Sequence, residues 1–224
     1  MAVLPVFPLG TAYLPGDAVA LTIFEQRYVQ MLNDVTKGNQ RFVSVLIERG
    51  SEVGGGDLRH DHGVEVEVSS MTETESVFLV IGVATVPCTI SHWLPDDPYP
   101  RGEAVSQIRT SLSDAEKYDV ASSLTLLGQN IRLIHETLAM GHEGDSPFED
   151  RGSQVATIAA GRWWDQRVTD SELWQAFWVL ARNLPSGPFD RYSLLTPGTL
   201  TSRVKRLKQT VEHVHEVVSF RFEQ

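Results

Sequence analysis

The sequence has few residues that could cross-link the chain or carry it into a membrane. Its 224 residues contain one cysteine, Cys88, so no disulfide can form within the chain, and we expect a reducing, cytoplasmic setting. No apolar run approaches the ~20 residues that a transmembrane helix needs. The first residues lack a basic region and are broken by Pro5 and Pro8, so we expect no signal peptide.

Basic residues are also scarce. Lysine and arginine number 19 against 29 acidic residues, and the net charge of −10 disfavours nucleic acid and anionic membranes. None of the four lysines follows a glycine, which excludes a Gly-x-x-x-x-Gly-Lys phosphate loop. Lys117, Lys205 and Lys208 fall on predicted exposed helix faces, where nothing would desolvate an ammonium enough to make it a catalytic base.

Metal ligands and nucleophiles lack the spacing that chemistry needs. His60-Asp61-His62 lies in a glycine-rich stretch without a third partner, and His135-Glu136 and His142-Glu143 never complete a His-Glu-x-x-His motif. Cys88 follows Pro87 in an apolar segment, with no basic neighbour to lower its pKa. We therefore expect no catalytic residue, no metal and no cofactor.

The first half of the chain is rich in predicted strands. Residues 42–47 form a near-continuous apolar run, residues 64–68 alternate strictly, and residues 77–86 form another apolar run with a bulge or bend at Gly82. One amphipathic helix is expected from about Phe24 to Val35, with Phe24 on its apolar face, and an exposed loop is expected over residues 54–62. Short strands with glycine and proline at the joints predict a compact β pseudo-barrel.

The second half changes to helical periodicity. Ser113 with Glu116, and Thr169 with Glu172, each form a capping-box pattern ahead of an apolar stripe. A third striped helix begins near Leu200. The sequence therefore predicts an α+β protein, with a β-rich subdomain over residues 1–110 and a helical bundle over residues 111–224.

The opening of the chain carries a specific pattern. Leu4-Pro5-Val6-Phe7-Pro8-Leu9 is followed by Tyr13-Leu14-Pro15-Gly16, and then by a segment that ends in Phe24-Glu25-Gln26-Arg27-Tyr28. This succession resembles the N-terminal substrate-binding domain of the Lon proteases, closely over residues 3–47 and loosely over the whole chain. The resemblance implies a PUA-like pseudo-barrel followed by a helical bundle. It also implies a non-catalytic module that recognises polypeptides, without the ATPase and Ser-Lys protease domains of full-length Lon.

The motif residues look structural rather than chemical. Pro15-Gly16 favours a tight turn, and Glu25 suits the positive end of a helix dipole. The family's Gly-x-x-Arg-Phe-x-Val element is absent, since residues 82–86 replace it. The residues to which we assign a structural role are Pro5, Phe7, Pro8, Pro15, Gly16, Phe24, Glu25, Arg27 and Tyr28.

The tryptophans are the candidates for peptide binding. Trp174 and Trp178 are four residues apart and form a second stripe beside the apolar stripe of their helix. This stripe either packs inside the protein or forms an exposed apolar groove for unfolded peptide, and both interpretations stay open. The candidate residues are Trp93, Trp163, Trp164, Trp174 and Trp178.

The expected partners are unfolded or tagged polypeptides, together with a protease or another partner protein; a homodimer is left open. The alternative from another class is an RNA-binding PUA-like module, because Arg203, Lys205, Arg206 and Lys208 cluster on the predicted polar face of the last helix. The overall acidity argues against RNA. An enzyme of an unrecognised kind would need a deep pocket lined by perturbed carboxylates or histidines.

Overall fold

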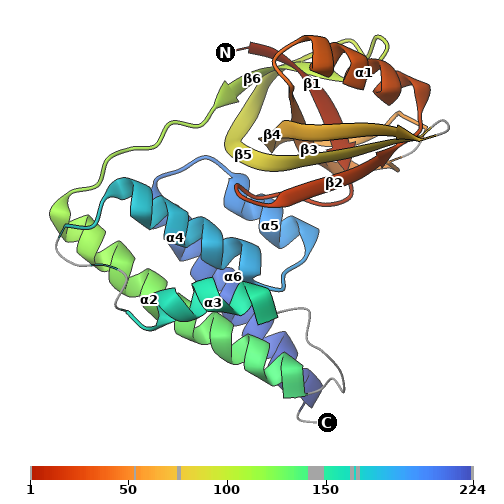
Figure 1. The fold of residues 1–224 in the computed structure, drawn as a ribbon. Helices are drawn as coiled ribbons and strands as arrows, with labels where there is room; N and C mark the ends of the chain where they lie inside the picture. The colour runs from red at the N-terminus through yellow and green to blue at the C-terminus, as the bar shows by residue number, and fades with distance from the viewer. Residues whose placement is uncertain are drawn as a thin grey trace. The chain divides into compact units, whose positions relative to one another are not determined.

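The computed structural model describes residues 2–52, 54–74, 77–140, 149–161, 164 and 167–222. The chain forms two compact units (Figure 1). The strand unit comprises residues 1–108 together with residues 191–197, and the helical unit comprises residues 109–190 and 198–224. The protein is therefore α+β, as its sequence predicts, and each unit is described by itself below.

The strand unit contains a mixed six-stranded sheet in the order β2-β5-β4-β3-β1-β6. Its strands are β1 (Ala2–Leu9), β2 (Ala18–Ile23), β3 (Arg41–Arg49), β4 (Leu58–Thr74), β5 (Val77–Leu94) and β6 (Arg101–Ser106). β1 runs parallel to β3, and the other pairs are antiparallel. β5 also pairs with β6, so five strands form a closed circuit, the predicted pseudo-barrel, and β2 is attached outside it.

The great length of β5 makes this topology possible. Its first part, from Phe78 to Val83, pairs with β2, and its last part, from Cys88 to Leu94, pairs with β6. Gly82 lies inside this strand, where a Cβ atom would come within 2.7 Å of the Glu67 carbonyl oxygen, so glycine permits close approach of β4. β5 continues through Gly82, and the irregularity expected there is a register shift in β4, between Val68, which pairs with Gly82, and Ser70, which pairs with Ile81.

Two local predictions in this unit are wrong. Residues 58–62 belong to β4 rather than to a loop, because Arg59 pairs with Ile47 and His62 with Thr89. The helix α1 (Gln26–Lys37) begins after Phe24, and the Phe24 side chain is exposed instead of facing the core. The buried face of α1 consists of Tyr28, Met31, Leu32 and Val35.

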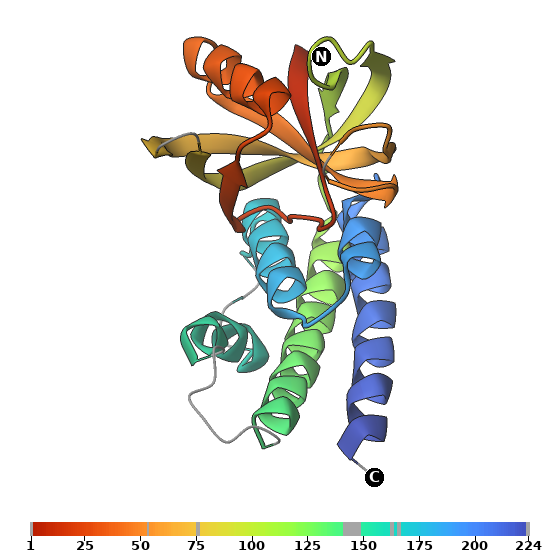
Figure 2. The same cartoon turned by 90° about the vertical axis from the view of Figure 1, so that its right-hand side faces the viewer.

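The helical unit is built around α2 (Asp114–Met140), which contacts α3 (Glu149–Ala159), α4 (Asp170–Asn183) and α6 (Leu200–Phe222). α5 (Pro188–Leu195) begins in this unit and ends in the strand unit. Both predicted capping boxes form: the Ser113 and Thr169 side chains accept from the backbone N–H groups of Glu116 and Glu172. α2 and α6 lie side by side and run in the same direction (Figure 2). None of the helices in the described ranges has the length and apolarity to cross a membrane.

Candidate functional site

The tryptophans of α4 are buried in the helical unit. Trp174 and Trp178 are 3% and 5% exposed, their ring centroids lie 6.2 Å apart, and both rings contact Phe177. Neither indole nitrogen has a hydrogen-bond acceptor among the described residues. These side chains form core packing, so the surface of α4 offers no tryptophan groove at these two positions.

Arg203 of α6 packs against the two tryptophan rings of this cluster. Its guanidinium carbon lies 5.5 Å from the ring centroids of both Trp174 and Trp178, and the side chain is 1% exposed. Burial, followed by the nearby charge of Arg206, lowers the pKa of Arg203 to about 10. The prediction that Arg203 lies on the polar face of the helix is therefore wrong, because cation–π contacts hold it inside.

Trp93 and Trp164 each donate a hydrogen bond to a side chain of their own unit. Trp93, in the strand unit, donates from Nε1 to the Asp61 carboxylate at 2.7 Å and lies 5.5 Å from the Arg59 guanidinium carbon. Trp164, in the helical unit, donates to the Thr125 hydroxyl at 3.2 Å. Trp163 lies outside the described residues. Of the described tryptophans, Trp93 belongs to the strand unit, and Trp164, Trp174 and Trp178 belong to the helical unit.

Several residues of the opening motif make contacts within the strand unit. Asp17 N–H donates to the Leu14 carbonyl at 2.9 Å, with Pro15 and Gly16 between them and Gly16 at φ 89°, which is the tight turn that the sequence predicts. Phe7 meets Tyr28 edge to face, with ring centroids 4.4 Å apart. Burial raises the pKa of Tyr28 to about 12.

Pro5, Phe7 and Pro8 lie in β1, and Phe7 is buried. Glu25 and Arg27 lie at the start of α1, and Glu25 bonds to the chain at Gly54. Glu25 occupies the N-cap position of α1 but makes no side-chain capping bond. Its carboxylate instead accepts from the Gly54 N–H at 3.3 Å and lies 3.2 Å from the Arg27 guanidinium. The pair therefore orders the chain around Gly54 rather than touching a candidate ligand site.

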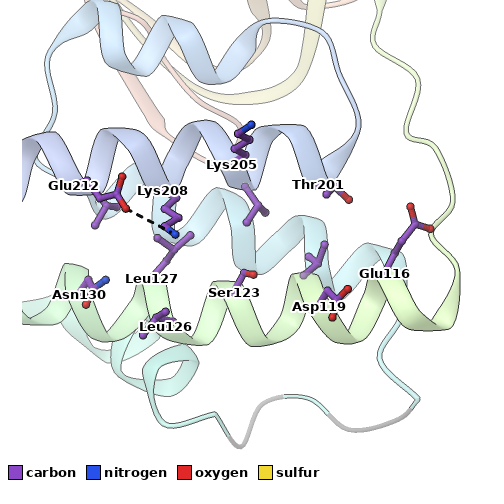
Figure 3. A pocket seen from close by; sticks show the side chains of 13 residues that line it. Glu116, Asp119, Ser123, Leu126, Leu127, Asn130, Thr201, Lys205, Lys208 and Glu212 are labelled. Atoms are coloured by element: carbon purple, nitrogen blue, oxygen red, sulfur yellow. Dashed lines mark ion pairs between the residues drawn. The ribbon is translucent and has the colours of Figure 1, made fainter.

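An apolar groove runs between the parallel helices α2 and α6 (Figure 3). Its cavity has a volume of about 310 Å³. Buried aliphatic side chains such as Leu127 and Val211 line it, and Leu126 stands at its edge, 55% exposed. The full lining is Glu116, Asp119, Val120, Ser123, Leu126, Leu127, Asn130, Thr201, Val204, Lys205, Lys208, Val211 and Glu212.

The two walls of the groove differ in charge. α2 contributes the carboxylates of Glu116 and Asp119. α6 contributes the ammonium groups of Lys205 and Lys208 together with the Glu212 carboxylate, which lies 3.9 Å from the Lys208 ammonium (Figure 3). The Ser113 hydroxyl and N–H donate to the Glu116 carboxylate, at 2.7 and 2.8 Å, and lower its pKa. The sequence signal for this groove was Leu126, an apolar residue outside the buried stripe of its helix, which we did not single out.

The candidate metal ligands and nucleophiles among the described residues were also located. No group of three metal-ligating side chains occurs among them. Cys88 is buried, and this burial, together with the charge of Glu65, raises the pKa of its thiol to about 12, so the thiolate is suppressed. His60 stacks on Tyr192 with ring centroids 4.1 Å apart. The α2–α6 groove can bind a ligand through its aliphatic side chains and through the charged groups of its lining.

A β pseudo-barrel and a helical bundle together define an α+β fold. The family model of the ATP-dependent protease La (LON) substrate-binding domain matches residues 3–213, so the chain belongs to this family. A search of curated protein sequences gives no match.

Two solved structures share the fold. One is a Lon N-terminal domain protein from Xanthomonas campestris, with 19% identity, a TM-score of 0.60, and coverage of 93% of this chain and 98% of that one. The other is the N-terminal domain of a Mycobacterium avium complex Lon protease, with 15% identity, a TM-score of 0.58, and coverage of 94% and 98%. Both likenesses concern the fold.

Proposed function

We propose that the protein is a non-catalytic module that recognises polypeptide segments through the α2–α6 groove. The observation that carries the proposal is this apolar cavity of about 310 Å³ in a chain of the substrate-binding-domain family. A preformed concave site with apolar walls suits the insertion of side chains from a partner. In addition to the bound polypeptide, we propose a second partner: a separate protease, or another protein that acts on the bound segment.

The shape of the groove favours a helical segment. Two parallel helices side by side leave a furrow into which a third helix can place apolar side chains at spacings of three and four residues. From Thr201 to Val211 the α6 wall spans roughly 15 Å at about 1.5 Å per residue, close to three helical turns. A partner helix with basic residues facing Glu116 and Asp119, and an acidic residue facing Lys205, would match both walls. Lys208 is already paired with Glu212 of its own helix.

RNA binding gains no support from the arrangement of the basic residues. Arg203 is buried between tryptophans, so the predicted cluster on α6 lacks one of its members. The neighbouring Glu212 lies 3.9 Å from the ammonium of Lys208. Each unit also carries net negative charge: acidic residues outnumber basic ones by fourteen to seven in the strand unit and by fifteen to twelve in the helical unit.

The test compares two leucines on α2 that lie one heptad apart. A fluorescent amphipathic helical peptide with the flanks described above is titrated into wild type, Leu126→Glu and Leu133→Glu. Leu126 lines the groove and Leu133 does not, although they are similarly exposed at 55% and 49%. We expect Leu126→Glu to weaken binding by about tenfold, or about 1.4 kcal/mol, and Leu133→Glu to change it by less than about twofold.

Equal effects of the two substitutions, or wild-type binding by Leu126→Glu, would remove the groove from the proposal. Mass spectrometry of the peptide after prolonged incubation checks the absence of catalysis, and a cleaved peptide would contradict the non-catalytic assignment. Preferential capture of RNA over the peptide would favour the alternative module.

A further inference from the structure

The strand β2 is the open edge of the sheet in the strand unit. It pairs with β5 from Ala18↔Val83 to Ile23↔Phe78, and no other described strand pairs with it. Every other strand has two neighbours over at least part of its length. Alternate N–H and C=O groups of an edge strand point away from its only neighbour, and these groups can template the addition of another strand.

This edge lacks the features that normally prevent strand addition. The segment Ala18–Ile23 contains no charged residue and no proline, and its register with β5 has no shift. The end of β4 beyond Val68 is a second edge, since only β5 pairs with it there, but it is protected. A register shift falls between Val68 and Ser70, and Glu73 is exposed. The chain thus protects one edge and leaves the other bare.

The exposed face beside the bare edge is apolar. Leu79, Ile81 and Val83 of β5 are 46%, 48% and 42% exposed. Their partners on β2 are Thr22, Ala20 and Ala18, all small and all exposed. Large side chains of an added strand could therefore lean over the alanines toward the aliphatic row. The opposite face of β2 is closed, because Val19 and Ile23 are buried in the core.

The negative charge of the strand unit indicates which polypeptide segments the edge would attract. The strand unit carries a net −7, from fourteen acidic and seven basic residues. One carboxylate borders the aliphatic row on the same face: Glu67 lies opposite Val83, and it also lies 3.6 Å from the Arg41 guanidinium. An incoming segment with lysine or arginine at its ends would be attracted, whereas an acidic segment would be repelled.

We propose that β2 is a strand-addition site for an extended, unfolded polypeptide segment with apolar residues at alternate positions and basic residues at its ends. The proposal rests on the polypeptide-recognition function above, but it adds a second site, in the other unit and with another mode of binding. Backbone hydrogen bonds would supply affinity without a fixed sequence, and the Leu79–Val83 row would select alternating apolar side chains.

The experiment uses the full chain and a synthetic peptide of about ten residues, near the usual strand length, that alternates leucine with threonine between terminal lysines. Two further peptides carry N-methyl groups, one on the odd residues and one on the even residues. An added strand directs only one of these sets of N–H groups toward β2. We therefore expect one methylated peptide to lose about tenfold in affinity and the other to bind within about twofold of the parent.

Two protein variants place the same charge on either side of Ile81. Ala20→Lys adds an ammonium on the edge strand, and Ser70→Lys adds one on β4, because both residues are register partners of Ile81. We expect Ala20→Lys to weaken the peptide by about tenfold and Ser70→Lys by less than about threefold. Amide hydrogen exchange at alternate residues from Ala18 to Ile23 should slow when the parent peptide binds.

Several results would overturn the proposal. Equal binding of all three peptides excludes backbone pairing, as does unchanged exchange in β2 while the peptide is bound. Protection of β2 without peptide, together with a concentration-dependent dimer in sedimentation, would make a second copy of the chain the occupant. If this peptide fails while the helical peptide binds the groove, strand addition alone is wrong; if both fail, the proposed function is wrong.

Discussion

The α2–α6 groove and the β2 edge offer two different kinds of surface. The groove presents side chains only, since the backbone groups of its helical walls are bonded within each helix. The edge presents backbone groups beside a row of aliphatic side chains. The groove also carries carboxylates on one wall and two ammonium groups with one carboxylate on the other, whereas the edge strand itself contains no charged residue. The first surface suits a folded helix, and the second suits a chain that has no structure before binding.

This difference bears on what a recognition domain must distinguish. Unfolded segments share a backbone and differ in side chains, so strand pairing is tolerant of sequence. Helix binding requires an apolar pattern with a period near 3.6 residues, which is far more selective. A protein with both surfaces could sort segments by their residual structure. The predictions below test this contrast, beginning with the largest expected effect.

Removal of the buried cation should affect the helical unit most. Arg203→Ala deletes a fully buried side chain that contacts two tryptophan rings, and we expect a loss of about 3 kcal/mol in the free energy of unfolding. Urea denaturation followed by circular dichroism measures it. Lys205→Ala, two residues along the same helix, should cost less than about 0.5 kcal/mol. A loss below about 1 kcal/mol for Arg203→Ala would show that the aromatic cluster closes without it.

Crossing the variants with the two peptides should separate the surfaces. Leu126→Glu should weaken the helical peptide by about tenfold and leave the extended peptide within about twofold. Ala20→Lys should do the reverse, because Leu126 and Ala20 belong to different units. Fluorescence anisotropy titrations give all four affinities. A variant that weakens both peptides equally would contradict the existence of two independent sites.

Salt should distinguish the surfaces by a smaller margin. Between about 50 mM and about 500 mM salt, the extended peptide with lysine ends should lose about fivefold in affinity, because its attraction to a unit of net −7 is screened. The helical peptide meets both signs of charge and should change by less than about twofold. A stronger salt effect on the helical peptide would contradict the claim that net charge attracts the extended peptide more than the helical one.

Acid should act weakly on the helical unit through its capping boxes. Hydrogen bonds from Ser113 and Thr169 lower the pKa values of Glu116 and Glu172 below the ordinary 4.5. Their stabilising contribution is therefore complete above pH 4.5 and is lost as the pH falls through the lowered values. Melting temperatures measured across this range should fall less steeply for Glu116→Gln and Glu172→Gln than for wild type. Parallel curves would contradict the role of these carboxylates.

The parts of the fold that the sequence predicted depend on local patterns that are unchanged by tertiary packing. The tight turn at Pro15-Gly16 and the capping boxes at Ser113 and Thr169 depend on a few neighbouring residues, so the sequence predicted them. The boundary at residues 58–62 was missed because the pairing of β4 with β3 and β5 outweighs the glycine-rich signal just before it.

The candidate sites were harder to predict for a physical reason. The tryptophan pair on α4 has the same spacing whether it is exposed or buried, and tertiary contacts such as those with Arg203 of α6 and with Arg109 bury it. The groove depends on which helices become neighbours, and the β2 edge depends on which strand lacks a partner. Both are properties of long-range pairing that no local period encodes.

The short segment from Arg191 to Pro197 has a consequence for dividing the chain into fragments. It belongs to the strand unit, where Arg191 donates to the Ala12 carbonyl at 2.7 Å and pairs with Asp17. The Gln107 amide likewise donates to the Leu195 carbonyl at 2.7 Å. The polypeptide thus passes between the units three times, and no single cut separates them. A fragment that ends near residue 110 would lose the cation beside Asp17, and supplying residues 191–197 as a peptide should restore it.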